Sequence, residues 1–583
     1  MVKLYLSEQY PDYAAIYTTS KSFYDWLKIS PSRLWKSGDF YYPVDEILDL
    51  VEYCEMVKLE LQVDDALMEA YRATVAKREL LDKYKSVNDL SDEEFNKFSD
   101  APLFKGKLYS YQKPIVVQML LMKRYLLSLE TGLGKTPLSL YAACLLKRIK
   151  PDLKVLIVCE SNQLHKPWLE TIYKLTSIKD IVILQGSKDE RLSTLYDPDS
   201  KKGWIWITTY DSIKLDGERM PQKWDIIVMD EVTKVKNMST LASKALRVFD
   251  STYMWALSAT PIMNTFTDLY GIFKLLHPKL FTNVANFINR YLIVDFFGRP
   301  KKVNKLTAQE LKRKIAPWFV QKTKVELGMQ KPVHIETYSV PLTTEQEAAL
   351  REVQIELDNG SKTAFDVQTK LRQICNSAKL IEDYATIDFD KSTNKLKVLN
   401  NIIVDTVDTK KKSLIVFSFF IPIVDWLSEY YGKNYSVGVI NGSSKKTCKN
   451  NKELYCSKCK YNKSCTSLKK IVEDFNTGKT EILFGTDSMQ RSHDFRACDT
   501  IVNFDLPWSS GELTQRIGRI ERATNPAKEY FIKNIISTGT KEESIMHIIE
   551  SKEKETNQIF PRYSVSFSKM SKEIQVKTYD DLS

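Results

Sequence analysis

The segment Ser128-Leu129-Glu130-Thr131-Gly132-Leu133-Gly134-Lys135-Thr136 decides the fold of this chain. An apolar run precedes it at 125–127, and a helical pattern follows it at 138–146. A strand, a glycine-rich turn and a helix in this order are typical of a phosphate-binding loop. Glycine lets the backbone wrap a polyphosphate without a Cβ in the way, and the N–H groups at the helix start point at the anion.

Each part of this loop has an expected role. Lys135 places a positive charge beside the β- and γ-phosphates, and the Thr136 hydroxyl ligates Mg²⁺. The fully spaced motif has glycine at position 129, where this chain has Leu129, so TGLGKT is a shorter form. The alternative is a turn that happens to carry Gly-Lys-Thr. Four residues form the expected backbone cradle: Thr131, Gly132, Leu133 and Gly134.

Two acids follow a buried strand farther along the chain. Continuous apolar runs predict parallel strands at 155–159, 204–210, 224–229 and 253–257. The third run ends in Asp230-Glu231. Asp230 can hold Mg²⁺ through water, and Glu231 can take a proton from the attacking water. The alternative is a solvated turn after a strand. Upstream of the phosphate loop, the Gln112 amide can donate to and accept from one adenine edge.

A second set of apolar runs predicts another parallel sheet, with strands at 413–418, 435–442, 481–487 and 500–505. The basic segment 515–522, QRIGRIER, comes after them. On a helix Gln515, Arg519 and Arg522 share one face, and guanidinium groups suit a γ-phosphate. We expect Arg519 and Arg522 to act as arginine fingers across an interdomain cleft. The alternative is a solvated basic helix face.

A lysine-rich insertion at 443–469 carries four closely spaced thiols. A set of four cysteines suits structural Zn²⁺, whose binding would stabilise a loop too polar to build its own core. An iron–sulfur cluster or free thiols are the alternatives. The predicted zinc ligands are Cys448, Cys456, Cys459 and Cys465.

The composition is that of an ordinary globular protein and bounds the possible partners. The 583 residues are 43% hydrophobic and 27% charged, with a net charge of +11 that suits a polyanion. No apolar stretch is long enough to cross a bilayer, and the first residues do not form a secretion signal. We therefore expect a cytoplasmic protein, or a nuclear one in a eukaryote. Aromatic and basic residues in 1–95 indicate either a small domain core or a nucleic-acid surface.

These motifs, in this order and spacing, resemble superfamily 2 helicases and translocases, in particular the Swi/Snf-type DNA-dependent ATPases. Tyr111-Gln112, TGLGKT, Lys236-Asn237, the segment 269–278 and LRQICN at 371–376 carry the likeness, which spans roughly 105–555. Three features depart from that family. DEVT replaces Asp-Glu-Ala/Gly-His, which leaves Thr233 at the histidine position. SAT at 258–260 replaces Thr-Gly-Thr, and 485–495 lacks paired glycines.

The resemblance implies an α/β fold of two RecA-like parallel-sheet lobes with helical insertions. We expect an accessory domain at 1–95, an ATP-binding lobe at 96–300, a helical linker at 301–390, a second lobe at 391–565 with the zinc insertion, and a tail at 566–583. ATP and Mg²⁺ would be the cofactors, beside structural Zn²⁺.

The resemblance also implies a function. It would be ATP-driven translocation on duplex DNA, which remodels protein–DNA complexes or regresses and anneals branched DNA. We expect DNA as the partner, with replication or recombination proteins as further partners, no membrane, and a monomer. Two rival hypotheses are a strand-separating DNA or RNA helicase and a DNA-binding protein with a decayed motor.

Overall fold

The structure is a computed structural model of residues 1–583, which fall into two compact units, Met1–Lys322 and Thr323–Ser583. It describes every residue outside the following positions: 11–12, 31, 37–38, 45–46, 87–89, 97–99, 161–167, 263–265, 282, 298, 359–363, 443, 445–467, 492–493, 508, 522–524, 548–575 and 579–583. Each unit is described by itself.

The first unit begins with a mixed five-stranded sheet in the order β3-β4-β2-β1-β5. Its strands are β1 (Val2–Leu6), β2 (Tyr13–Thr18), β3 (Leu34–Lys36), β4 (Asp39–Pro43) and β5 (Leu61–Val63). Its helices are α1 (Lys21–Ile29), α2 (Ile47–Met56) and α3 (Asp65–Ser86). Phe23, Leu50 and Leu67 from these helices pack with Leu4 and Tyr42 of the sheet, so many of the aromatic residues of this region form a core.

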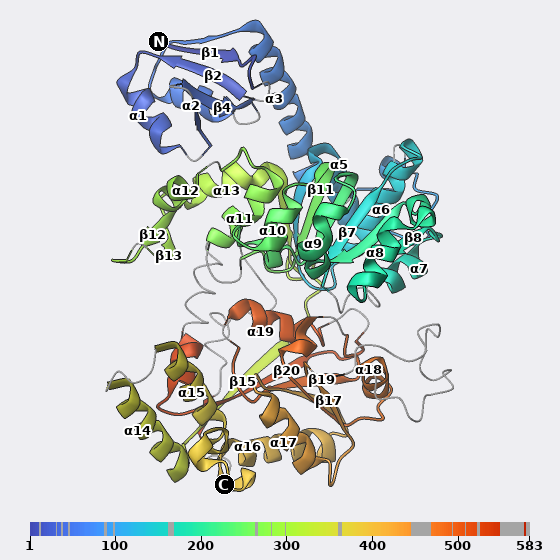
Figure 1. The fold of residues 1–583 in the computed structure, drawn as a ribbon, viewed down its shortest axis with the longest axis vertical. Coiled ribbons are helices and arrows are strands. Elements are labelled where there is room, and N and C mark those ends of the chain that lie inside the picture. The colour runs from blue at the N-terminus through green and yellow to red at the C-terminus, as the bar shows by residue number, and fades with distance from the viewer. Residues whose placement is uncertain are drawn as a thin grey trace. The chain divides into compact units, whose positions relative to one another are not determined.

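The long helix α3 leads from this sheet towards the rest of the first unit (Figure 1). The Gln118 side chain of α5 (Gln112–Met122) donates to the carbonyl of Tyr84 in α3 over 3.0 Å. The short helix α4 (Asp92–Asn96) buries Phe95 against Tyr141. This buried ring docks an otherwise polar segment onto the first unit.

A seven-stranded sheet forms the centre of the first unit, and all of its strands are parallel. The spatial order is β14-β6-β11-β10-β7-β9-β8. The strands are β6 (Arg124–Leu129), β7 (Val155–Cys159), β8 (Ile181–Ile183), β9 (Ile205–Thr209), β10 (Lys223–Asp230), β11 (Asp250–Ser258) and β14 (Phe319–Lys322). The apolar runs that predicted strands in this region are thereby confirmed.

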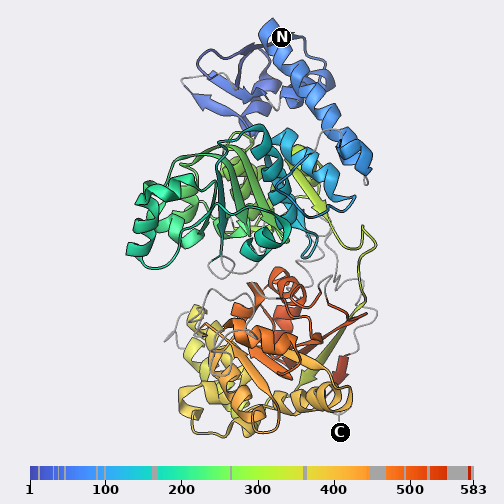
Figure 2. The same cartoon turned by 90° about the vertical axis from the view of Figure 1, so that its right-hand side faces the viewer.

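Helices lie on both sides of this sheet (Figure 2). After α5 they are α6 (Lys135–Ile149), α7 (Leu169–Leu175), α8 (Lys188–Tyr196), α9 (Tyr210–Asp216), α10 (Leu241–Leu246) and α11 (Thr267–Leu276). Two further helices, α12 (Val284–Tyr291) and α13 (Ala308–Ile315), flank an antiparallel hairpin of β12 (Leu292–Val294) and β13 (Pro300–Val303).

The second unit contains another all-parallel seven-stranded sheet, in the order β17-β18-β16-β19-β20-β15-β21. Its strands are β15 (Val333–Val340), β16 (Ser413–Phe417), β17 (Val437–Ile440), β18 (Ile482–Gly485), β19 (Cys498–Asn503), β20 (Tyr530–Ser537) and β21 (Val576–Thr578). Its helices are α14 (Thr344–Asp358), α15 (Ala364–Asn376), α16 (Lys395–Ile403), α17 (Ile421–Tyr431), α18 (Leu468–Asn476) and α19 (Ser510–Ile517).

Apolar residues from both faces of this second sheet pack under helices. Side chains of α18 and α19, such as Phe475 and Leu513, cover one face, and side chains of α16 and α17, such as Leu399 and Leu427, cover the other. The prediction of two parallel-sheet lobes is therefore confirmed. The predicted linker at 301–390 is divided, because β14 belongs to the first sheet and β15 to the second.

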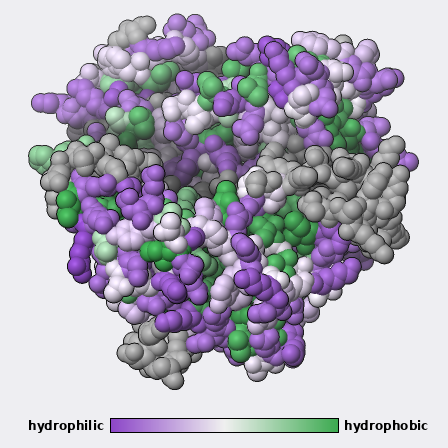
Figure 3. Space-filling view, turned by 60° about the horizontal axis from the view of Figure 1, so that its bottom comes forward, coloured by the Kyte–Doolittle hydropathy of each residue, from purple (hydrophilic) through white to green (hydrophobic). Residues whose placement is uncertain are grey.

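The face of the molecule shown in Figure 3 is mostly polar, and hydrophobic residues lie there in small groups among hydrophilic ones. No helix in the described part of the chain is long and apolar enough to cross a membrane.

Candidate nucleotide site

The ends of three neighbouring strands in the first unit gather the predicted chemistry. In the sheet, Ser258 of β11 pairs with Ser128 of β6, and Leu257 pairs with Asp230 of β10. The phosphate loop after β6, the acidic pair at the end of β10 and the segment after β11 therefore share one edge. Ligands of open parallel sheets bind outside the carboxyl ends of the strands, which is where these residues lie.

The phosphate loop has the backbone that its glycines predict. Gly132 and Gly134 have positive φ values of 90° and 83°, a conformation that side chains with a Cβ rarely adopt. A Cβ on Gly134 would lie 2.2 Å from the Gln112 amide nitrogen. Thr136 lies in the first turn of α6, directly after Lys135. The sequence and structure thus place the cradle, Lys135 and Thr136 at one helix start.

The predicted adenine-reading residue, Gln112, is buried and hydrogen-bonded inside the protein. Its Nε2 donates to the carbonyl of Leu133 over 3.1 Å, and its Oε1 accepts from the backbone N–H of Tyr109 over 2.9 Å. The Tyr111 hydroxyl donates to the same Leu133 carbonyl over 3.1 Å. In this structure Tyr111 and Gln112 therefore stabilise the phosphate loop through the Leu133 carbonyl, to which both side chains donate.

Lys135 lies close to the acidic end of β10. Its Nζ donates to the carbonyl of Leu129 over 2.7 Å, within the loop. Its positive charge also acts on Asp230, whose pKa it lowers. The lysine that would hold phosphates and the carboxylate that would hold Mg²⁺ are thus electrostatically coupled.

Asp230 is a tightly held carboxylate. Its Oδ2 accepts from the Trp168 indole N–H over 2.9 Å, and its Oδ1 accepts from the backbone N–H of Glu231 over 3.1 Å. Burial raises the pKa of Asp230 above its ordinary value, while the Trp168 hydrogen bond, the Lys135 charge and the Glu231 N–H each lower it. A bound cation would favour the ionised form in the same way as Lys135.

Glu231 has an uncommon backbone conformation for a residue with a Cβ, with φ 50° and ψ 57°. Non-glycine residues in this left-handed region cost conformational energy and concentrate at functional sites. The surrounding contacts hold the turn. The Tyr210 hydroxyl donates to the carbonyl of Asp230 over 2.7 Å, and Lys234 forms a 2.6 Å ion pair with Glu160. Thr233, which takes the usual histidine position, is buried in the same turn.

The segment after the acidic pair is locked to α11. Lys236 forms a 2.8 Å ion pair with Asp268. A Cβ on Gly271 would lie 1.7 Å from the Lys236 carbonyl oxygen, so only glycine lets the helix backbone approach this closely. The position of α11 is therefore tied to the residues that follow Glu231.

These features fit ATP and Mg²⁺. The left-handed glycines and the α6 N-terminus form a cradle suited to an anion, and Asp230 and Thr136 carry oxygen atoms of the kind that Mg²⁺ prefers as ligands. No group of three or more His, Cys, Asp or Glu side chains among the described residues could hold a metal by itself. The predicted Mg²⁺ site does not need one, because phosphate oxygens and water complete such shells.

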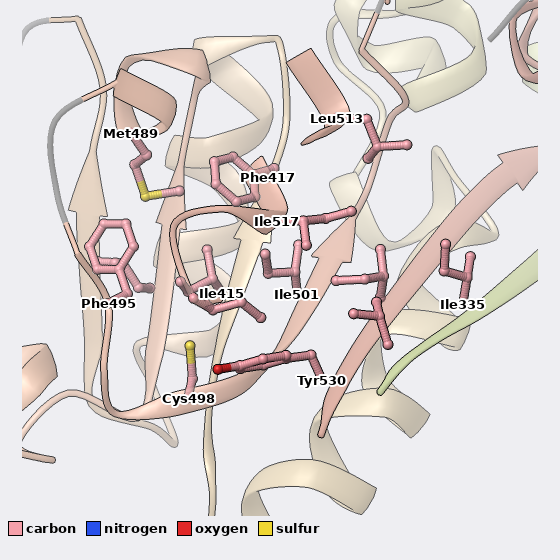
Figure 4. Close-up of a cluster of buried hydrophobic side chains, with 14 of the residues drawn as sticks. Ile335, Ile415, Phe417, Met489, Phe495, Cys498, Ile501, Leu513, Ile517 and Tyr530 are labelled. Carbon is pink, nitrogen blue, oxygen red and sulfur yellow. The ribbon is translucent and has the colours of Figure 1, made fainter. Parts of the chain in front are cut away.

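The arginine motif of the second unit follows a packed helix. Leu513 and Ile517 of α19 are buried against Ile415, Phe417 and Ile501 of the sheet (Figure 4). Ser509 caps the helix by accepting from the N–H of Glu512. This packing fixes the direction of the motif relative to its own sheet.

Arg516, which we did not single out from sequence, is fully buried in this motif. Its guanidinium donates to Asn503 Oδ1 and Asp487 Oδ1 over 2.8 Å each, and to the Asp505 carbonyl over 3.0 Å. It also stacks on the Phe417 ring, 5.0 Å from the centroid. Arg516 is therefore a structural cross-link of the second unit.

The helix that we expected to carry Gln515, Arg519 and Arg522 on a shared face ends before Arg519. The helix α19 ends at Ile517, and Gly518 begins a tighter turn whose N–H groups donate three or four residues back. Glycine favours such an end because it weakens a helix. Arg519 is 8% exposed, and its Nε donates to the carbonyl of Gln515. Arg522 lies outside the described residues.

The residues on both sides of Arg522 are held by one preceding segment. Lys324 forms a buried ion pair with Glu521, 3.1 Å between Nζ and Oε2. Lys331 donates to the carbonyls of Asn525 and Ala527 over 2.8 and 2.7 Å. The two lysines lie between β14 and β15 along the chain, so the start of the second unit supports its arginine motif.

Some predicted residues are not placed, and some functional ones were missed. The predicted zinc ligands, Cys448, Cys456, Cys459 and Cys465, all lie outside the part of the chain that the structure describes.

Trp168 and Tyr210 hold Asp230 but had no assigned role. Their signal was present in the motifs LHKPW and ITTYDSI, where each follows a strand of the same sheet.

A phosphate loop and an acidic pair at the same carboxyl edge of one parallel sheet, with an arginine motif on a second such sheet, define a P-loop ATPase of the motor class. The family comparisons agree. The SNF2-related domain matches residues 111–380, and the helicase conserved C-terminal domain matches residues 394–524. The chain therefore belongs to the Swi/Snf-type ATPases of superfamily 2.

Curated relatives come from bacteria and eukaryotes. The uncharacterized ATP-dependent helicase MG018 of Mycoplasma genitalium is 25% identical over 73% of this chain and 39% of its own length. The uncharacterized ATP-dependent helicase YqhH of Bacillus subtilis is 22% identical over 73% of this chain and 74% of its own. The ISWI chromatin-remodeling complex ATPase ISW1 of Saccharomyces cerevisiae is 22% identical over 77% of this chain and 40% of its own.

Two of these relatives are much longer than this chain, which spans about two fifths of the length of MG018 and of ISW1. Among solved structures, the Sulfolobus solfataricus SWI2/SNF2 ATPase core in complex with dsDNA covers 82% of this chain and 99% of its own, with 20% identity and a TM-score of 0.38. At that score the likeness adds nothing to the family assignment.

Proposed function

We propose that this protein is an ATP-driven translocase on double-stranded DNA that remodels protein–DNA complexes or branched DNA. The observation that carries the proposal is the strand-end site of the first unit, where Lys135, Asp230 and Glu231 lie on one sheet edge in a chain of this family. The net charge of +11 suits a polyanionic substrate.

The residues of the first unit would divide the chemistry among them. Bound ATP supplies the phosphoanhydride bond whose hydrolysis drives movement. Lys135 and the loop amides hold the phosphates, Asp230 and Thr136 hold Mg²⁺, and Glu231 takes the proton of the attacking water. Trp168 and Tyr210 keep Asp230 and its turn in place.

Arg519 and Arg522 would act on the same nucleotide from the second unit as arginine fingers. The described contacts support this division of labour within the motif. The Arg516 guanidinium is hydrogen-bonded to Asn503 and Asp487 of its own unit. Lys324 binds Glu521 and Lys331 binds Asn525, on the two sides of Arg522 in the sequence.

The test is ATP hydrolysis with no nucleic acid, linear duplex, forked duplex, single-stranded DNA and RNA. We expect duplex and forked DNA to stimulate turnover, and we expect DNA affinity to fall steeply with salt because phosphate contacts release counterions. Stimulation by single strands or RNA alone would refute duplex translocation and favour a strand-separating helicase. Absence of hydrolysis under all conditions would favour the decayed motor.

A further inference from the structure

The hairpin of β12 and β13 presents two aromatic rings to solvent. Phe296 is 97% exposed and Phe297 is 76% exposed, although burial of such rings ordinarily stabilises a protein. Their centroids are 5.5 Å apart in an edge-to-face arrangement. Ile293 and Val294 of β12 are also exposed. Large apolar side chains grouped at the tip of a projecting element are typical of a contact with a partner.

The turn is held in shape by its own polar groups. The Asp295 carboxylate accepts from the backbone N–H groups of Phe297 and Arg299 over 2.9 Å each. The Asp295 N–H donates to the Arg299 carbonyl over 2.9 Å. These bonds hold the backbone of Asp295, Phe297 and Arg299 without a partner molecule.

The hairpin also has a rigid base. Leu292 and Val303 are buried where the strands leave the body of the unit. Arg290 of α12 makes a bidentate ion pair with Glu310 of α13, and the Tyr291 hydroxyl donates to the same carboxylate over 2.9 Å. The two helices that flank the hairpin are thus cross-linked, and β12 and β13 extend beyond them (Figure 1).

Packing connects this base to the nucleotide site of the same unit. Phe287 of α12 contacts Tyr270 of α11, with ring centroids 5.3 Å apart. Helix α11 is fitted through Gly271 against Lys236, which follows Glu231. The base of the hairpin therefore packs on α11, and α11 packs on the residues that follow Glu231.

The charge of the hairpin favours a nucleic acid. Arg299, Lys302 and Lys305 are exposed basic residues, and Asp295 is the single acid in the sequence 292–305. An apolar protein pocket would leave these cations without a partner, whereas a phosphate backbone supplies one. The Arg299 guanidinium lies 5.5 Å from the Phe297 ring centroid, so charge and ring are side by side. Proteins that unstack DNA place apolar wedges such as phenylalanine between base steps while basic residues contact the DNA around them.

We propose that the β12–β13 hairpin is a wedge that stacks Phe296 and Phe297 on the bases at a duplex fork or end, with its basic residues on the backbone. The proposal rests on DNA being the substrate of the motor. It assigns this motor a means to recognise junctions, which a translocase that only tracks the backbone does not need.

The experiment compares the affinity of the full chain for forked and blunt linear duplex of equal length, without ATP. The double variant Phe296→Ala/Phe297→Ala should lose fork affinity by about tenfold or more, the size expected for one or two base–aromatic stacks. Affinity for linear duplex should change little. The variant Phe297→Tyr keeps the ring and should retain fork binding. Tyr196→Ala removes another exposed ring of the first unit, 67% exposed, and should bind as wild type.

Two results would overturn the wedge. One is an unchanged fork-to-linear ratio in the double variant; the other is an equal loss on both DNAs, which would make the hairpin a general contact. Hydrolysis is measured separately on the same proteins. Wild-type fork preference that depends on the rings, without DNA-stimulated hydrolysis, would support the wedge and refute the proposed motor function. DNA-stimulated hydrolysis together with an unchanged fork-to-linear affinity ratio in the double variant would support the motor function and refute the wedge.

Discussion

The two units each contain a seven-stranded parallel sheet, but the charged groups discussed here have different partners in the two units. At the edge of the first sheet, Asp230 and Lys135 influence each other beside a glycine-lined loop whose backbone suits an anion. In the second unit two fully buried cations are paired internally: Arg516 with Asp487, and Lys395 with Glu542, at 2.8 Å each. The first sheet is therefore arranged to bind a ligand, and the second to hold its own arginine motif in place.

The arginines of the second unit give the largest expected contrast. Arg519→Ala should lower ATP turnover by about 10³-fold or more, as for a lost arginine finger, and leave the melting temperature near that of wild type. Arg516→Ala should destabilise the fold by about 3–5 kcal/mol, because it leaves Asp487 and Asn503 without their buried partner. Thermal unfolding and turnover, measured on both variants, separate the two roles.

The opposite pattern would break the comparison. If Arg519→Ala unfolded the protein while Arg516→Ala remained stable and inactive, the structural and catalytic arginines of the motif would have to be exchanged. Arg516→Lys is the matched control, since it keeps the charge but loses the forked donors that reach three acceptors.

In the first unit, Glu231→Gln should lower turnover by about 10²-fold or more while DNA binding is retained, because glutamine keeps the shape but cannot take a proton. Lys135→Ala removes the positive charge beside the phosphates, so it should lower turnover and also weaken ATP binding. Turnover and equilibrium ATP binding are the readouts. Wild-type turnover in both variants would show that the strand-end site does not hydrolyse ATP.

A smaller effect is expected from Trp168→Phe, which removes the indole N–H from Asp230. Burial raises the pKa of Asp230 and the indole bond lowers it, so the variant should have a still higher pKa. The acid limb of kcat/KM against pH should move to higher pH, since Mg²⁺ binding needs the carboxylate. Turnover at its plateau should change only a few-fold.

Stability gives an independent measure of the same change. Because the folded-state pKa of Asp230 is raised, its contribution to stability is present at low pH and is lost as the pH rises through that pKa. The indole bond favours the ionised form, so the stability difference between wild type and Trp168→Phe should grow over that rise. An equal difference at all pH values would show that Trp168 acts only through packing.

The sequence predicted the parts of the fold whose patterns are local. Continuous apolar runs such as 155–159 are buried on both faces, as a central parallel strand requires. The strand β15 was missed because His334 and Glu336 alternate with its buried residues, and the pattern of a strand near the sheet edge is weaker. The glycine-rich loop and the acidic pair were found because their chemistry needs a fixed spacing.

The remainder depended on contacts that sequence does not show. Arg516 and Arg519 are the same residue type in one motif, and only the positions of Asn503 and Asp487 reveal that Arg516 is the one that cross-links distant strands and loops of the unit. The β12–β13 hairpin was not recognised because DFFGRP is also typical of an ordinary turn. The end of α19 at Ile517 likewise depends on how Gly518 and Arg519 bond to the preceding turn.

The most direct test of the central claim is displacement of a third strand from a DNA triplex placed on a linear duplex. A motor that moves along intact duplex should release the third strand with ATP, and Glu231→Gln should not. We predict that release slows as the triplex is placed farther from the duplex end. Strong duplex-stimulated hydrolysis without any release would contradict duplex translocation.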